Sequence, residues 1–182
     1  MRIRPYRRDD ADQIADILAA GWQVAYAGFM PPELLAPRVE PVRRRAEIGA
    51  WLDDVDAALE QVLVAETETP RTVIGFVHIV HEDKAGLGAA AHINLLYVTP
   101  TQFGRGIGRA LMAAAADALA ATTSGAIVLS AYALNPYRGF YRHLGGIEAA
   151  HRTVDFDGHA LEAVYYRWDS PEALKAGALA PR

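Results

Sequence analysis

Residues 92 to 131 follow the order strand, glycine-rich turn, helix and strand, and this order constrains the fold of the chain most strongly. The runs HINLLYV (92–98) and AIVLSA (126–131) are short, apolar and rich in branched residues, as buried strands are. Between them, apolar residues from Ile107 to Leu119 recur three and four positions apart, which predicts a helix packing one stripe on a sheet. Because strands joined through a helix run parallel, the sequence predicts a right-handed crossover.

Periodicity predicts four further elements before this crossover. We expect helices at 9–20 and 41–58 and strands at 61–66 and 72–80. A chain of 182 residues is long enough for one domain with a sizeable core and short for two. The sequence therefore predicts a single domain over residues 1–169, followed by a C-terminal tail over 170–182.

The last third of the chain carries two turn signals. The stretch NPYRGFYRHLGG (135–146) predicts a short helix that ends at Gly145 and Gly146. Two alternating runs then flank Asp157-Gly158, a pair of residues typical of two-residue hairpin turns. We therefore expect a terminal hairpin over residues 152–168.

Composition excludes several kinds of chemistry. The chain has no cysteine, which excludes disulfides, thiolate metal sites and a cysteine nucleophile. Its six histidines show no chelating spacing, so we expect no metal. A net charge of −4 with scattered basic residues gives no footprint for nucleic acid, and it weakly favours a small, cationic substrate.

Membrane and export signals are also missing from the sequence. No apolar run reaches the roughly 18 uncharged residues of a membrane span. The first ten residues already contain several Arg and Asp, which argues against a secretory signal. We therefore expect a cytoplasmic protein that does not bind a membrane.

Three glycines lie between the strand that ends near Val98 and the following helix. Gly104, Gly106 and Gly108 leave the backbone bare where a helix begins, and unpaired N–H groups at such a start bind anions. Arg105 and Arg109 add positive charge. The alternative reading is a flexible turn without a ligand. The spacing fits neither a Walker loop nor a dinucleotide fingerprint, because Arg109 and Leu111 stand where the latter needs glycine or alanine.

These residues resemble the GNAT superfamily of acetyl-CoA-dependent N-acetyltransferases. The likeness is carried by INLLYVTPTQFGRGIGRALM, by ALNPYRGFYRHLGG about thirty residues later, and by the terminal hairpin. Phe103 departs from the family pattern, which usually has Gln or Arg there. The resemblance implies an α/β fold: a mixed, mostly antiparallel central sheet with a splayed parallel strand pair, flanked by helices.

The resemblance also implies which residues bind acetyl-CoA. The pyrophosphate would lie over the glycines, and the pantetheine arm would pair with the end of the preceding strand, while an asparagine and a tyrosine would contact the rest of the arm. The implied cofactor-binding residues are Tyr97, Val98, Phe103, Gly104, Arg105, Gly106, Ile107, Gly108, Arg109, Asn135 and Tyr141. Asn135 is equally explained as a helix cap.

Acetyl transfer to an amine needs a base for the amine and benefits from an acid for the leaving thiolate. The resemblance implies that Tyr141, in Phe140-Tyr141 before Leu144-Gly145, is the acid. Many family members carry Glu early in the central strand, and His92 occupies that place here; histidine titrates near neutrality and is our candidate base. The open alternatives are a core tyrosine and a structural histidine.

Trp22 and Tyr26 stand four residues apart at the end of the first expected helix. In the family this region folds over the acceptor, so the two rings are candidate substrate-binding residues that shape a pocket or stack on a cation. An ordinary core contact between residues i and i+4 explains them equally well.

The resemblance predicts an N-acetyltransferase that acts on a small-molecule amine or a peptide N-terminus by direct transfer. Three alternatives stay open: an acyltransferase with another donor or acceptor, a non-catalytic acyl-CoA-binding module, and a glycine-rich loop that binds another nucleotide. Dimers are common in the family that this chain resembles. The hairpin also leaves a strand edge that a second subunit could cover, so we expect a homodimer.

Overall fold

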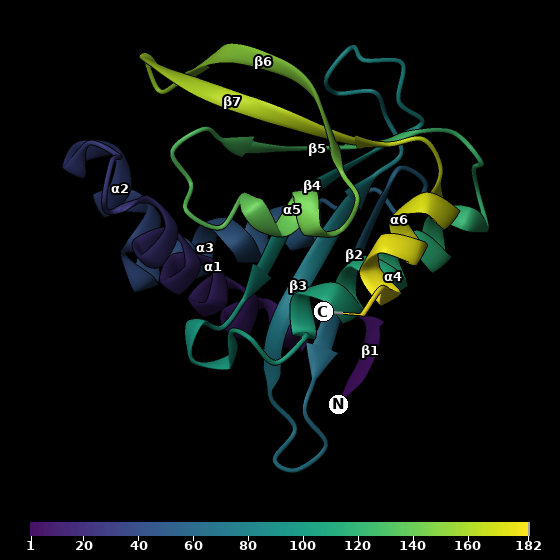
Figure 1. Ribbon diagram of the computed structural model, residues 1–182. Helices are drawn as coiled ribbons and strands as arrows, with labels where there is room; N and C mark the ends of the chain where they lie inside the picture. The colour runs from purple at the N-terminus through teal and green to yellow at the C-terminus, as the bar shows by residue number, and fades with distance from the viewer. Residues whose placement is uncertain (182) are drawn as a thin grey trace. The chain divides into compact units, whose positions relative to one another are not determined.

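A computed structural model of the chain describes residues 1–181, so Arg182 of the expected tail lies outside the described residues. The seven strands form one sheet in the order β1-β2-β3-β4-β5-β7-β6 (Figure 1). The pairs β1–β2, β5–β7 and β6–β7 are antiparallel, whereas β4 and β5 are parallel over Ala91–Ile93 and Ile127–Leu129. This confirms the expected mixed sheet flanked by helices.

The elements follow one another along the chain as β1 (Arg2–Pro5), η1 (Arg8–Asp10), α1 (Ala11–Tyr26), α2 (Pro32–Val39), α3 (Pro41–Asp53), β2 (Glu60–Glu66), β3 (Val73–Val80), β4 (Ala91–Val98), η2 (Pro100–Gln102), α4 (Ile107–Ala120), β5 (Ile127–Tyr132), α5 (Gly139–His143), β6 (Ile147–Phe156), β7 (His159–Trp168) and α6 (Pro171–Leu179). The four strands expected between residues 61 and 131, the helix between them, the short helix and the hairpin are all present.

Contacts between residues divide the chain into two compact units. Unit 1 comprises Met1–His78 and Leu95–Leu111, and unit 2 comprises Ile79–Asn94 and the chain from Met112 onward. The strands β3 and β4 and the helix α4 each contribute residues to both units. The single domain over 1–169 stays a prediction.

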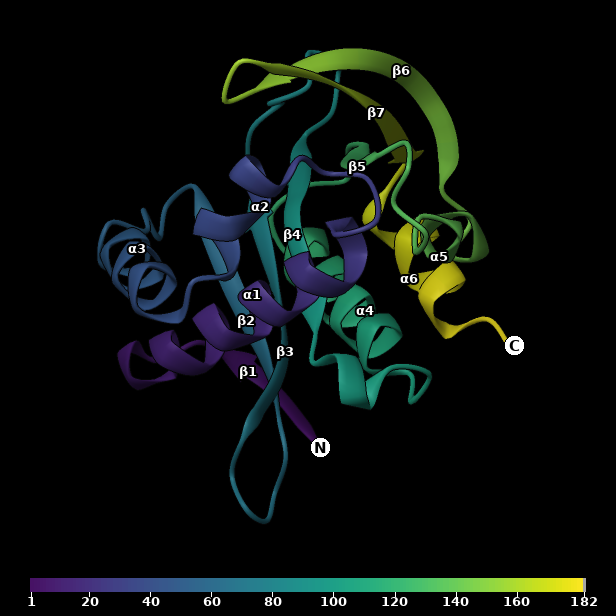
Figure 2. The ribbon, with the colours of Figure 1, turned by 90° about the vertical axis from the view of Figure 1, so that its left-hand side faces the viewer.

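In unit 1, the helices α1, α2 and α3 pack against one another (Figure 2). The apolar stripe of α1 is buried, with Ile14, Ala15 and Leu18 almost fully removed from solvent. Burial of such side chains is the main stabilising term of a helix that packs on a sheet.

Three elements of unit 1 differ from the sequence-based expectation. The helix α2 was not expected, although Pro32 at its first position is pre-organised for a helix start. The helix α3 ends at Asp53 and not at 58, because acidic residues disfavour a helix C-terminus and Asp56 accepts a hydrogen bond from the Ala58 N–H at 2.9 Å. The short strand β1 also escaped prediction.

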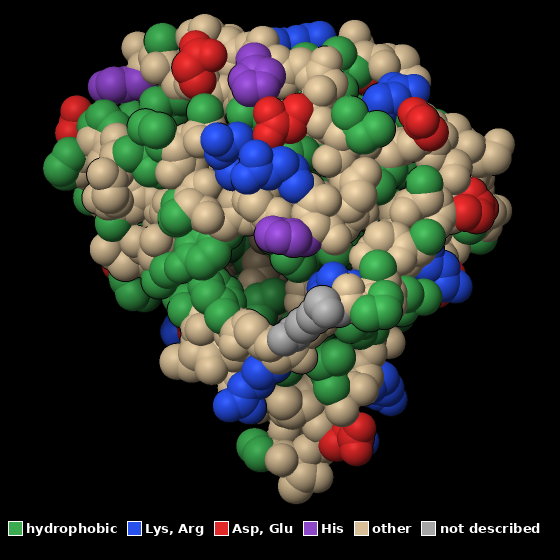
Figure 3. Space-filling model, viewed as in Figure 1, with side chains coloured by type: hydrophobic (Ala, Val, Ile, Leu, Met, Phe, Trp, Pro, Cys, Tyr) green, Lys and Arg blue, Asp and Glu red, His purple; other side chains and the backbone are tan. Residues whose placement is uncertain are grey.

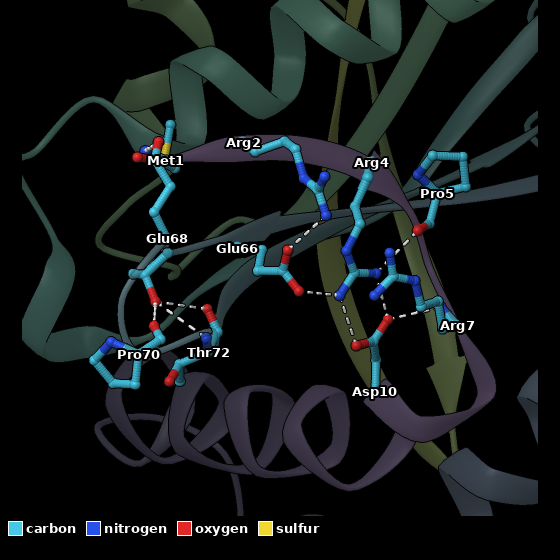
Figure 4. Close-up of polar contacts among 11 residues, drawn as sticks. Met1, Arg2, Arg4, Pro5, Arg7, Asp10, Glu66, Glu68, Pro70 and Thr72 are labelled. Atoms are coloured by element: carbon cyan, nitrogen blue, oxygen red, sulfur yellow. Dashed lines mark hydrogen bonds and ion pairs between the residues drawn. The ribbon is translucent and has the colours of Figure 1, made fainter.

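A buried ion-pair network joins β1, β2 and the start of α1 (Figure 4). The Arg4 guanidinium donates to Asp10 Oδ2 at 2.7 Å and to Glu66 Oε1 at 2.6 Å, and Arg2 donates to Glu66 Oε2 at 2.9 Å. The hydrogen bonds from Arg4, together with those from Arg2, lower the pKa of the Glu66 carboxyl to about 2. Glu66 therefore contributes to the stability of unit 1 through this network only while its carboxyl is ionised.

This network predicts a specific loss of stability in acid. The ordinary pKa of the Glu66 carboxyl is 4.5 and its folded value is about 2. Its contribution is therefore present above about pH 4.5 and is lost as the pH falls towards 2. In thermal unfolding, we expect Glu66→Gln to flatten the dependence of Tm on pH in this window, whereas Asp169→Asn, which changes an exposed carboxylate, leaves it unchanged. Equal slopes for Glu66→Gln and the wild type would contradict the assignment.

In unit 2, the β6–β7 hairpin lies beside β5 and turns at Asp157 and Gly158 (Figure 1). Both turn residues have positive φ, 48° and 82°, as a type I′ turn requires, which confirms the expected hairpin. The expected tail forms α6, which packs on the segment after α5. An added Cβ at Gly177 would lie only 1.9 Å from the Leu144 carbonyl oxygen, so this close approach requires glycine.

Candidate functional site

The glycine loop, residues 103–109, connects η2 to the first turn of α4 and belongs to unit 1. Gly104 and Gly106 have φ values of 77° and 81°, which residues other than glycine rarely adopt. The start of the connection is fixed, because the Thr99 N–H donates to the Ile74 carbonyl at 2.9 Å. The glycines are therefore required by the path of the backbone.

This backbone path leaves the first N–H groups of α4 without hydrogen-bond partners inside the helix. The Ala110 N–H donates to the Gly106 carbonyl at 3.0 Å, so the preceding N–H groups of the helix lie before its first internal hydrogen bond. The first turn contains no acidic residue, and Arg105 and Arg109 flank it. Donors and positive charge at a helix start suit a phosphate group. Phe103, 41% exposed, adds no polar side chain here.

Tyr97, near the end of β4, is held tightly within unit 1. Its ring stacks on Phe76 with a centroid distance of 5.8 Å. A Cβ added at Gly21 would lie 2.4 Å from that ring, and a Cβ at Gly75 would lie 2.9 Å from the Tyr97 carbonyl oxygen and 3.2 Å from a methyl carbon of Val98. Sequence reasoning missed both glycines, since neither has a turn signal around it.

The candidate substrate residues lie directly beside Tyr97. Trp22 and Tyr26 make an edge-to-face contact with ring centroids 4.8 Å apart, and the Tyr26 and Tyr97 hydroxyls are 3.2 Å apart. The structure therefore brings the predicted acceptor residues and a predicted cofactor residue into contact. The cations close to Trp22 come from the protein: the Cζ atoms of Arg38 and Arg44 each lie 5.9 Å from the Trp22 ring centroid.

Arg44 is the most unusual charged residue of this region. Only 8% of its side chain is exposed, and burial lowers the pKa of its guanidinium, an effect that a hydrogen bond to Glu47 partly offsets. Its Nε has no hydrogen-bond partner among the described residues. Nothing in the sequence indicates this burial, because Arg43, Arg44 and Arg45 are three consecutive basic residues within one expected helix.

The remaining candidates lie in unit 2, on three separate segments. His92 is on β4, opposite Val128 of β5, and is buried with 7% of its surface exposed. Asn135 is also buried, and its Oδ1 accepts from the Tyr137 N–H at 2.9 Å. The helix α5 begins only at Gly139, so Asn135 closes a turn ahead of the helix and is not its cap.

Tyr141 lies on α5 and is half-buried. Its ring packs against Phe140 and Tyr166, with centroid distances of 5.5 and 5.4 Å, and its carbonyl accepts from the Gly146 N–H at 3.0 Å. The end of α5 is fixed further by Leu144, whose carbonyl accepts from the Trp168 indole N–H at 2.8 Å. The fold of unit 2 therefore orients Tyr141 rigidly.

A polar cluster next to this segment is centred on the Glu148 carboxylate. The Glu148 carboxylate lies 3.5 Å from a side-chain nitrogen of Arg138, 3.7 Å from one of Arg142 and 3.1 Å from one of His151. The buried Tyr166 hydroxyl donates a hydrogen bond to it at 3.3 Å. Figure 3 shows acidic, basic and histidine side chains next to one another over the β6–β7 hairpin. Among the described residues, no three His, Asp or Glu side chains are grouped as metal ligands.

Comparison with known families gives one matching model, described as an acetyltransferase (GNAT) domain, which covers residues 58–145. This range contains the glycine loop, His92, Asn135 and Tyr141. Comparison with curated proteins gives no significant match.

Solved acetyltransferases share the fold over nearly the whole chain. A GCN5-related N-acetyltransferase from Rhodopseudomonas palustris has a TM-score of 0.70 and 23% identity, covering 92% of this chain and 94% of that one. A ribosomal-protein-alanine N-acetyltransferase from Brucella melitensis has a TM-score of 0.69 and 18% identity, covering 93% and 99%. The paia N-acetyltransferase from Thermoplasma acidophilum, in complex with coenzyme A, has a TM-score of 0.62 and 17% identity, covering 92% and 98%.

Proposed function

We propose that this chain, whose residues 58–145 match the model of an acetyltransferase (GNAT) domain, transfers an acetyl group from acetyl-CoA to a primary amine of a small molecule or a peptide N-terminus. The transfer is direct, within a ternary complex. The observation that carries this proposal is the glycine loop, where positive φ at Gly104 and Gly106 precedes a helix start flanked by Arg105 and Arg109.

Unit 1 binds the phosphates in this proposal. The N–H groups of residues 104–109 donate to the pyrophosphate, and the Arg105 and Arg109 side chains neutralise its charge. The backbone of Tyr97 and Val98 pairs with the pantetheine arm. Gly75 supports this role, because its missing side chain leaves room for β4 to approach β3 closely.

Unit 2 supplies the proton-transfer groups. Acetyl-CoA brings the acetyl group as an activated thioester. As the nitrogen–carbon bond forms and the carbon–sulfur bond breaks, His92 takes the proton that leaves the amine, and the Tyr141 hydroxyl donates a proton to the leaving sulfur. Solvent then restores both residues. Asn135 contacts the cofactor arm, and the contacts of Tyr141 with Phe140 and Tyr166 hold its ring in place.

A screen of amines tests the proposed activity. The protein is incubated with acetyl-CoA and a panel of amino acids, aminoglycosides, polyamines and peptides, and free thiol is measured over time. We expect at least one amine to accelerate thiol release well above the rate without amine. A protein that binds acetyl-CoA and releases no thiol with any acceptor would instead be an acyl-CoA-binding module.

A homodimer stays part of the proposal. The strand β6 is the last in the sheet order and offers an edge that a second copy can cover. A monomeric mass in light scattering at micromolar concentration would contradict the homodimer.

Within the described part of the chain, no helix has the length and apolar character needed to cross a membrane.

A further inference from the structure

We propose that the acceptor carries a carboxylate, which binds the Arg44 guanidinium beside Trp22 in unit 1. The inference rests on the proposed function and names its substrate class: amines that also bear a carboxyl group, as amino acids do. It reverses the expectation of a cationic substrate that the net charge of the chain favoured.

The first argument is that Arg44 lacks sufficient negative charge within the protein. Its Nη1 donates to Glu47 Oε2 at 3.1 Å. The other oxygen of the same carboxylate accepts from Arg43 at the shorter distance of 2.7 Å, so two guanidinium groups share one charge. The Asp16 carboxylate pairs with Arg45 at 2.7 Å. A side chain that is 92% buried therefore keeps an Nε donor without an acceptor.

The second argument is the arrangement around Trp22. Arg38, on α2, and Arg44, on α3, both lie 5.9 Å from its ring centroid, and the positive charge of Arg38 lowers the pKa of Arg44 further. The positive charge of Arg38 raises the energy of the charge on Arg44, and an anion bound at Arg44 would lower it. A guanidinium presents paired donors that match the two oxygens of a carboxylate.

The third argument is position. Tyr97 contributes to the electrostatic environment of Arg44, and its hydroxyl lies 3.2 Å from that of Tyr26. Arg44, Trp22 and Tyr26 therefore adjoin the end of β4, which the proposed function assigns to the pantetheine arm. Arg38 and Tyr97 are only partly buried, so this group of residues reaches the surface. An amino group tethered to a carboxylate at Arg44 would be held beside the end of β4.

A purely structural role for Arg44 is a poor explanation. A buried ion pair is seldom worth more than an apolar side chain of the same volume, since removing the charges from water costs as much as their attraction returns. We therefore expect Arg44→Met to fold with an unchanged or higher Tm. A clearly lower Tm would assign the guanidinium to the packing of α3.

The test uses sets of three amines that share one side chain: the amino acid, its amide, and the amine without the carboxyl group. For the wild type we expect kcat/KM for the best amino acid to exceed that for its amide and its amine by about 30-fold or more. Arg44→Met should remove this difference by lowering kcat/KM for the amino acid alone. Arg45→Met, a control one residue away that leaves Glu47 shared between Arg43 and Arg44, should keep it.

Three outcomes would overturn the inference. The first is a wild type that uses the amine as well as the amino acid. The second is Arg44→Met keeping the preference. The third is a loss of acetyl-CoA affinity in Arg44→Met, which would assign the guanidinium to a cofactor phosphate.

A binding measurement separates this inference from the proposed activity. Calorimetry with the amino acid in the presence of coenzyme A requires no turnover. Binding to the wild type that is lost in Arg44→Met and kept in Arg45→Met supports the carboxylate site even if no thiol is released. Absence of binding to the wild type at millimolar concentration overturns it even if other amines are acetylated.

Discussion

Valine in place of Gly106 or Gly108 is expected to abolish acetyl-CoA binding in calorimetry while the protein stays folded. At Gly106 the φ of 81° is strained for any side chain and most severely for a branched one. At Gly108, in the first turn of α4, two added methyl groups would occupy the space that a phosphate needs to reach the helix N–H groups.

A matched control separates backbone strain from loss of the phosphate contact. Gly158 has nearly the same φ, 82°, in the hairpin turn, and nothing lies within 4 Å of an added Cβ. Gly158→Val should therefore suffer comparable strain and retain acetyl-CoA affinity. If Gly106→Val is folded and binds acetyl-CoA as tightly as the wild type, the glycine loop is not the phosphate site.

Turnover is expected to depend on His92 and Tyr141 much more than cofactor binding does. If His92 is the base, kcat/KM for the amine rises with pH through the range in which histidine titrates, about pH 6 to 7. His92→Ala should flatten this limb and lower turnover by roughly 10²–10⁴-fold. Tyr141→Phe removes only a hydroxyl and keeps the ring contacts with Phe140 and Tyr166, so it should lower turnover without loss of stability.

Neighbouring residues of the same type provide the controls. Tyr137→Phe, just ahead of α5, and His151→Ala, on β6, should leave turnover close to that of the wild type. Acetyl-CoA affinity should be nearly unchanged in all four variants. If His92→Ala and Tyr141→Phe both retain full turnover on a genuine acceptor, protons move through water or the substrate, and both assignments are wrong.

The sequence predicted those features that local chemistry determines. Branched apolar runs placed β2 to β5, and the backbone preference of Asp157-Gly158 placed the hairpin turn. The glycines predicted a loop before α4, and in the structure Gly104 and Gly106 of that loop have positive φ. In these cases the residues themselves restrict the backbone, so the pattern carries the information.

Features that depend on distant parts of the chain could not be predicted in this way. Gly21 and Gly75 are needed because Tyr97, more than twenty residues after either, packs against them. The proposed role of Arg44 follows from its burial and from the sharing of Glu47 with Arg43, and both arise only in the folded chain. The helix α2 contains three prolines in or next to it, and its stability comes from burying Leu34 and Leu35.

The most direct test of the account measures two products together. Purified protein is incubated with acetyl-CoA and the best amine of the screen, and free coenzyme A thiol and N-acetylated amine are both quantified by mass spectrometry. The account predicts that the two appear in equal amounts and that both fall together in Tyr141→Phe. Thiol release without an acetylated amine, or no release with any amine despite tight acetyl-CoA binding, would contradict it.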